Sequence, residues 1–89
     1  MAALNHDDAV WESITPRRAW VLRELADGHS LHATAARLNL TYNGVRSHVQ
    51  DLKVITGCES VSELGRFWRR YRGDWLRFMA ASGGARVAD

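Results

Sequence analysis

The chain has 89 residues, a single cysteine, and no apolar run near the length that spans a bilayer. From that length we expect one domain with a small core and no separate catalytic or sensor domain. The net charge is only +2, but residues 15–86 hold all twelve basic residues against six acidic ones, a net charge of +6. A basic body suits a polyanionic partner, and the lone cysteine and missing leader favour a cytoplasmic protein with no membrane partner.

The first helix signal comes after an irregular start. Residues 1–14 show no sustained period, so we expect an N-terminal arm that is loose unless its apolar residues pack back onto the domain. Those apolar residues are Val10, Trp11 and Ile14. Thr15-Pro16 then predicts a helix start, because Thr caps free N–H groups and Pro lacks the N–H that would go unpaired. Gly28 is the expected end of this helix.

The next two predicted helices are short and close together. Ser30 caps a helix over Leu31 to Leu38, and Asn39 suits the left-handed backbone of a turn. Thr41 caps a further helix from Tyr42 to about Ile55, whose buried face is expected to hold Val45, Val49 and Leu52. Two helices joined by so short a turn predict a helix-turn-helix, which lays its second helix in the major groove of DNA.

The C-terminal third continues the helical pattern. Ser60 and Glu63 form a capping box that predicts a fourth helix to about Arg72. We expect Gly73 to end that helix and residues 75–81 to form a short fifth one. The predicted organisation is therefore an all-α protein divided as follows: arm 1–14, helix-turn-helix domain 15–72, helical extension 73–81 and disordered tail 82–89.

Short motifs keep one spacing without a gap over residues 15–65. They are Thr15-Pro16-Arg17, Val21-Leu22, Leu25-Ala26-x-Gly28-x-Ser30, Ala35-Ala36-x-Leu38-x-Leu40-Thr41, Val45-Arg46-x-His48-Val49 and Gly57 with Ser62-Glu63-Leu64. Together they resemble the LuxR-type (GerE-type) helix-turn-helix domain of bacterial transcription regulators, in its stand-alone form. The resemblance implies a four-helix domain, here with an extra short C-terminal helix, in a bacterial or phage-encoded protein that acts at the nucleoid.

The chain departs from that family at several positions. Arg18 and Ala33 stand where the family usually has Glu, which removes two capping boxes. Thr34, Gly44 and Ile55 stand where it usually has Ile, Thr and Lys. We expect these changes to affect DNA affinity more than the fold.

The outward face of the helix over residues 42–55 carries the expected DNA contacts. Arg can bind guanine with two hydrogen bonds and Gln can bind adenine in the same way. By matching position in the family motif, the expected base contacts are Arg46, Ser47 and Gln50. The expected phosphate contacts are Thr41, Tyr42, Asn43, Lys53, Arg37 and Arg17. The plain alternative for all of them is a solvated helix face.

The residues give little support for a catalytic site or a metal site. No grouping of nucleophile, base and acid is apparent, and there is no Gly-rich phosphate loop, so we expect no catalytic activity and no cofactor. His29 and His32, even with Cys58, lack the paired spacing of zinc ligands, so no metal site is expected.

Aromatic residues suggest protein contacts. Phe67 and Tyr71 form a second stripe on the fourth predicted helix that the domain need not bury, which predicts a homodimer, at least on DNA. Trp20 lies off the buried face of its helix, so we expect another segment to cover it. The candidates are the arm, the segment around Trp75 and Phe78, and a partner protein. We favour the C-terminal segment.

Two functions from different classes follow. The first is a sequence-specific transcription regulator that reads double-stranded DNA with residues 42–55. The alternative is an interaction module of helix-turn-helix fold that binds RNA polymerase or another regulator. The Trp- and Arg-rich stretch over residues 66–81 keeps the alternative open, since these residue types dominate protein interfaces; the same stretch could instead complete the core or lie on a membrane surface.

Overall fold

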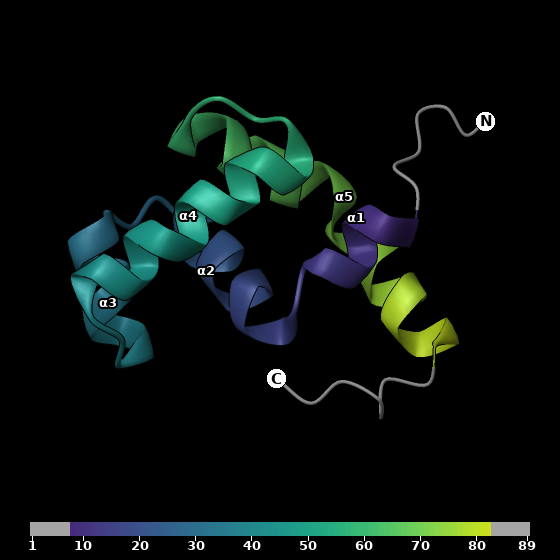
Figure 1. The fold of residues 1–89 in the computed structure, drawn as a ribbon, viewed down its shortest axis with the longest axis horizontal. Helices are drawn as coiled ribbons and strands as arrows, with labels where there is room; N and C mark the ends of the chain where they lie inside the picture. The colour runs from purple at the N-terminus through teal and green to yellow at the C-terminus, as the bar shows by residue number, and fades with distance from the viewer. Residues whose placement is uncertain (1–7, 83–89) are drawn as a thin grey trace.

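The structure, a computed structural model, describes residues 8–82, and these residues form helices and connecting turns without strands (Figure 1). The helices are α1 (Asp8–Ser13), α2 (Pro16–Ala26), α3 (Leu31–Leu38), α4 (Tyr42–Thr56) and α5 (Val61–Ala81). The predicted all-α class is confirmed. Two parts of the predicted organisation lie outside the described residues: the first half of the arm, residues 1–7, and the tail over residues 82–89 except for Ser82.

Side-chain caps begin the helices where the sequence predicts them. The hydroxyl of each cap accepts a hydrogen bond from the backbone N–H three residues later, which satisfies one of the unpaired donors of the first turn. The four caps are Thr15, Ser30, Thr41 and Ser60. Asn39 and Gly57, which follow α3 and α4, adopt left-handed backbone with φ of 58° and 79°.

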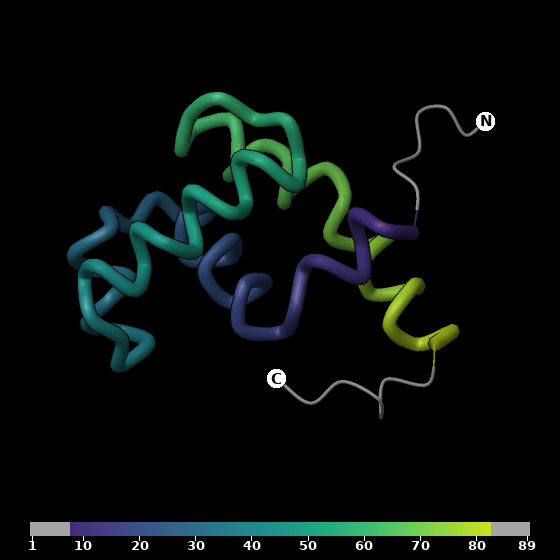
Figure 2. The backbone as a smooth tube through the Cα atoms, viewed as in Figure 1, coloured from purple at the N-terminus to yellow at the C-terminus, as the bar shows by residue number. Residues whose placement is uncertain are grey.

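The core lies where α5 crosses α2 and where α4 packs beside them. Leu22, Leu52 and Leu64 come from these three helices and are fully buried. Gly65 allows the close approach of α5, because a Cβ added there would lie 3.3 Å from the Cα of Ala26. Figure 2 shows the chain passing from α4 over the top of the molecule into α5, which then runs toward the end where α1 lies.

The N-terminal arm is partly helical. Residues 8–13 form α1, and Trp11 and Ile14 are buried in the core. The expectation of a loose arm is therefore wrong for these residues, and the alternative, that its apolar residues pack back, is confirmed for Trp11 and Ile14. Burial of a large aromatic ring is worth about 2 kcal/mol or more and outweighs the weak local helix signal.

Helix α5 continues without a break through Gly73. The prediction that this glycine ends one helix and separates a short extra one is wrong. A single Gly costs a helix only about 1 kcal/mol, and contacts on both sides hold the helix together. The rings of Trp68 and Trp75 lie 5.7 Å apart across the glycine, and Trp75 Nε1 donates a hydrogen bond to the backbone oxygen of Ile14 at 2.8 Å.

No helix among residues 8–82 has both the length and the apolar content needed to cross a bilayer.

Candidate nucleic-acid interface

The candidate interface is built on α3, a three-residue turn and α4. The turn closes because the left-handed Asn39 redirects the chain, and the N–H of Leu40 donates to the backbone oxygen of Ala35 at 2.9 Å. Thr41 then caps α4 by accepting from the N–H of Gly44 at 2.9 Å. Three or four residues is the connection length of helix-turn-helix motifs. The turn at Asn39 and the cap at Thr41 thus fix the residue at which α4 begins and its direction relative to α3.

Helix α4 has one buried and one exposed face. Its buried residues are Val45, Val49 and Leu52, as predicted. The residues predicted to contact bases, Arg46, Ser47 and Gln50, are all exposed and come from the same side of the helix. The helix spacing therefore brings these three together on one accessible surface, and their contact with bases stays a prediction.

The residues predicted to contact phosphates fall into two groups. Thr41, Tyr42 and Asn43 are exposed at the N-terminal end of α4, where unpaired N–H groups and the helix dipole favour anions. Lys53 is half-buried three turns further along, and Arg17 is exposed on the first turn of α2, apart from the α4 row. Only the first group surrounds the start of the candidate reading helix.

Tyr42 is held against α3 by a stacked ring. The rings of His32 and Tyr42 lie 4.1 Å apart between centroids, with 13° between their planes. This contact crosses the turn and restricts the side chain at the start of α4. The sequence prediction considered His32 only as a metal ligand, and no spacing signal paired it with Tyr42, because the contact joins the first turns of two different helices.

Arg37 has a structural partner as well as an exposed side chain. Its Nε donates to Oε1 of Glu24, which is almost fully buried, and His29 Nε2 lies 3.5 Å from the same oxygen. These contacts join α3 to α2. Arg37 therefore positions the helix pair whether or not it meets a phosphate, and Glu24 is a residue that the sequence prediction missed.

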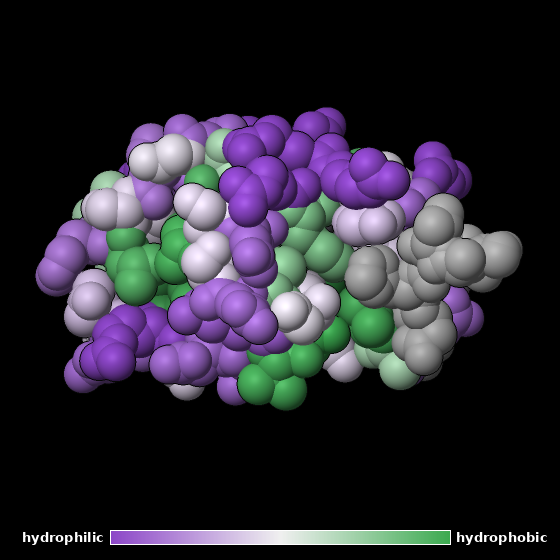
Figure 3. All heavy atoms as spheres, turned by 90° about the horizontal axis from the view of Figure 1, so that it is seen from above, coloured by the Kyte–Doolittle hydropathy of each residue, from purple (hydrophilic) through white to green (hydrophobic). Residues whose placement is uncertain are grey.

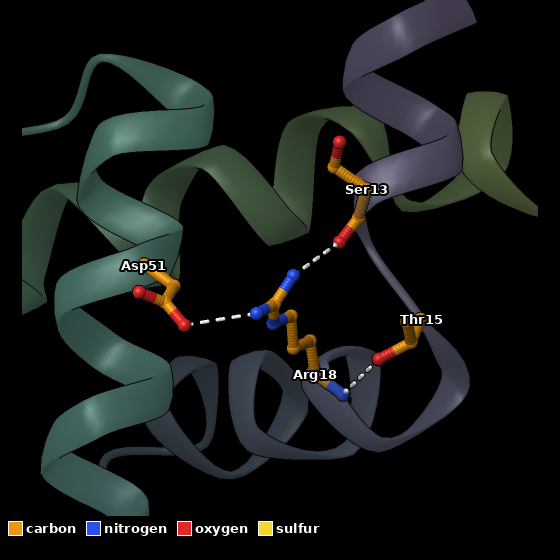
Figure 4. Close-up of polar contacts among 4 residues, drawn as sticks. All are labelled: Ser13, Thr15, Arg18 and Asp51. Carbon is orange, nitrogen blue, oxygen red and sulfur yellow. Dashed lines mark hydrogen bonds and ion pairs between the residues drawn. The ribbon is translucent and has the colours of Figure 1, made fainter. Parts of the chain in front are cut away.

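Arg18 ties α2 to α1 and to α4 (Figure 4). Its guanidinium donates to Oδ2 of Asp51 on α4 and to the backbone oxygen of Ser13 at the end of α1, each at 2.9 Å. Its backbone N–H donates to the capping hydroxyl of Thr15. Asp51 follows Gln50 directly, so this ion pair offsets an acidic charge that would otherwise repel phosphate beside the candidate base contacts.

The stripe expected to form a dimer is covered by this chain itself. Phe67 is buried and Tyr71 half-buried, because the ring of Trp11 lies 6.1 Å and 6.2 Å from theirs. The prediction that the domain leaves these two residues uncovered is wrong. The reason is α1, which the irregular sequence of the arm did not reveal.

The basic charge is concentrated on α5. This helix carries five exposed arginines (Arg66, Arg69, Arg70, Arg72 and Arg77), whereas α4 has only Arg46 and Lys53. Figure 3 shows strongly hydrophilic residues gathered along the upper edge of one face, with hydrophobic residues exposed between other polar groups. Within residues 8–82, no group of three or more His, Cys, Asp or Glu could hold a metal ion.

Protein-family models, curated proteins and solved structures all give no match to this chain. The family resemblance therefore rests on the motifs in the sequence, and the arrangement of α3 and α4 is the structural observation that bears on function.

Proposed function

We propose that the chain is a sequence-specific, LuxR-type DNA-binding regulator of transcription that reads the major groove with α4. One observation carries the proposal: Arg46, Ser47 and Gln50 lie exposed on one side of α4, opposite its buried face. These side chains match the hydrogen-bonding edges of guanine and adenine. The basic body of the chain supplies the long-range attraction that any DNA ligand requires.

In this proposal the N-terminal half of α4 enters the groove. Arg46 donates two hydrogen bonds to O6 and N7 of a guanine, and Gln50 pairs with an adenine in the same way. Thr41, Tyr42 and Asn43 meet the phosphates at the groove edge, where they set the register of the helix without reading sequence. Each bidentate base contact is worth about 1–3 kcal/mol of discrimination against the wrong base.

The contacts behind α4 support this role, because a reading helix has to be held in a fixed orientation. The ion pair between Arg18 and Asp51 joins α4 to α2, and the Glu24–Arg37 pair joins α2 to α3. They hold the helix pair as one unit before DNA arrives, which lowers the entropic cost of binding.

A homodimer on two half-sites, in a bacterial cytoplasm, remains part of the proposal. Since α1 covers Phe67, a dimer needs another surface. One exposed apolar candidate is Val54, which is 84% exposed on the last turns of α4.

The test is selection of duplexes from a random DNA library with the full chain, followed by binding measurements on the enriched site. The proposal predicts a recurring motif and binding that weakens steeply with salt. Enrichment of no motif over several rounds would contradict it and would favour the alternative, an interaction module of the same fold.

A further inference from the structure

A hollow opens between α2 and α5, away from the candidate reading helix. Its volume is about 610 Å³, and its lining residues come from α2, from Asp27 directly after it, and from α5. Those that matter here are Trp20, Arg23, Arg69, Arg72, Trp75 and Leu76. Because neither α3 nor α4 contributes a residue, the hollow can be filled while α4 is engaged elsewhere.

Some of the apolar side chains in the hollow are left partly exposed by the fold. Trp20 is 51% exposed and Leu76 is 49% exposed, whereas Trp75 beside them is buried. The expectation that the C-terminal segment covers Trp20 is therefore wrong: Trp75 instead donates a hydrogen bond to the backbone oxygen of Ile14, the residue after α1. Covering the half-exposed side chains of Trp20 and Leu76 would remove apolar surface from water, which favours association.

The rim of the hollow is positively charged. Three arginines stand on it against one acidic residue, Asp27. Two of them are held in place: the guanidinium of Arg23 lies 5.1 Å from the centre of the Trp20 ring, and Arg69 Nη1 donates to the backbone oxygen of Ala26. Arginine and tryptophan held side by side are typical of binding hot spots.

We propose that this hollow docks an acidic segment of a partner protein. A large apolar side chain of that segment fits between Trp20 and Leu76, and its carboxylates pair with Arg23 and Arg72. The volume lies within the range of sites that hold small ligands, which is enough for one or two side chains. The charge of the rim selects an anionic occupant, and the aliphatic Leu76 favours an apolar side chain over a stacked base.

The test uses the full chain and a fluorescein-labelled synthetic peptide of Asp, Glu, Leu and Phe, followed by fluorescence anisotropy. We expect saturable binding that weakens with salt. Arg72→Glu and Leu76→Asp should each weaken it by about tenfold or more. Arg66→Glu is the matched control, since it makes the same charge change on an exposed residue of α5 outside the hollow, and it should weaken binding by only about twofold.

The outcomes separate this proposal from its rivals. Absence of saturable binding, or equal weakening by Arg66→Glu and Arg72→Glu, would overturn it. Tighter binding of a thymidine oligonucleotide that is lost in Leu76→Asp would overturn it in favour of a nucleic-acid site. Circular dichroism checks that each variant folds. Leu76→Asp should leave duplex binding unchanged and Arg46→Ala should leave peptide binding unchanged, so failure here does not decide the DNA-binding proposal.

Discussion

Arg18 and Asp51, 33 positions apart in the chain, meet in an ion pair of 2.9 Å that joins α2 to α4 (Figure 4). The same guanidinium donates to the last residue of α1, so one side chain links three helices. The link holds the candidate reading helix and also offsets the acidic charge on it. A residue that looked like a lost capping carboxylate thus has a structural role of its own.

Removing that link should destabilise the chain. We expect Arg18→Ala to lower the free energy of unfolding by about 1–2 kcal/mol, because two charge-assisted hydrogen bonds are lost from a partly buried site. Urea denaturation measures it. Arg66→Ala, on an exposed part of α5, is the control and should change the value by about 0.5 kcal/mol or less. Equal effects of the two substitutions would show that the link does not contribute to stability.

Thr34 offers a stabilising substitution. Its side chain is fully buried, and its hydroxyl has no hydrogen-bond partner among the described residues. Thr34→Val keeps the shape and removes the unpaired polar group, so we expect stability to rise by about 1 kcal/mol. Thermal unfolding checks it. A fall in the melting temperature would mean that the hydroxyl is paired in solution.

Two glycines of α5 should respond in opposite directions to alanine. At Gly65 the new Cβ would lie 3.3 Å from the backbone of Ala26, so Gly65→Ala should cost about 1–3 kcal/mol by pushing α5 away from α2. At Gly73 the nearest atom is the flexible end of Arg77, 3.6 Å away. Gly73→Ala should therefore stabilise the helix by about 0.5–1 kcal/mol.

Urea denaturation of both glycine variants tests two features: the close packing of α5 on α2, and the continuity of α5 through residue 73. If both alanines stabilise, the helices do not approach as closely as described. If Gly73→Ala destabilises, residue 73 is not helical in solution.

The sequence predicted well what local chemistry decides. Thr15, Ser30, Thr41 and Ser60 cap helices because a hydroxyl and a nearby N–H lie within one turn of each other, which the spacing alone reveals. The outward row of α4 followed from helix period in the same way.

What the sequence did not reveal depends on contacts between distant segments. Helix α1 forms because Trp11 packs against Phe67. Helix α5 continues through Gly73 because Trp75 donates a hydrogen bond to Ile14. Neither contact leaves a periodic signal. In the candidate site, the ion pair between Arg18 and Asp51 was not predicted for the same reason, because Asp51 lies on another helix.

The central claim is that α4 reads sequence, and a comparison of two variants on two DNAs tests it most directly. Fluorescence anisotropy would measure the affinity of Arg46→Ala and Lys53→Ala for the selected site and for random duplex at one salt concentration. We predict that Arg46→Ala loses about 1–3 kcal/mol on the selected site and little on random duplex, while Lys53→Ala weakens both alike. Equal loss on both DNAs for Arg46→Ala would contradict the account.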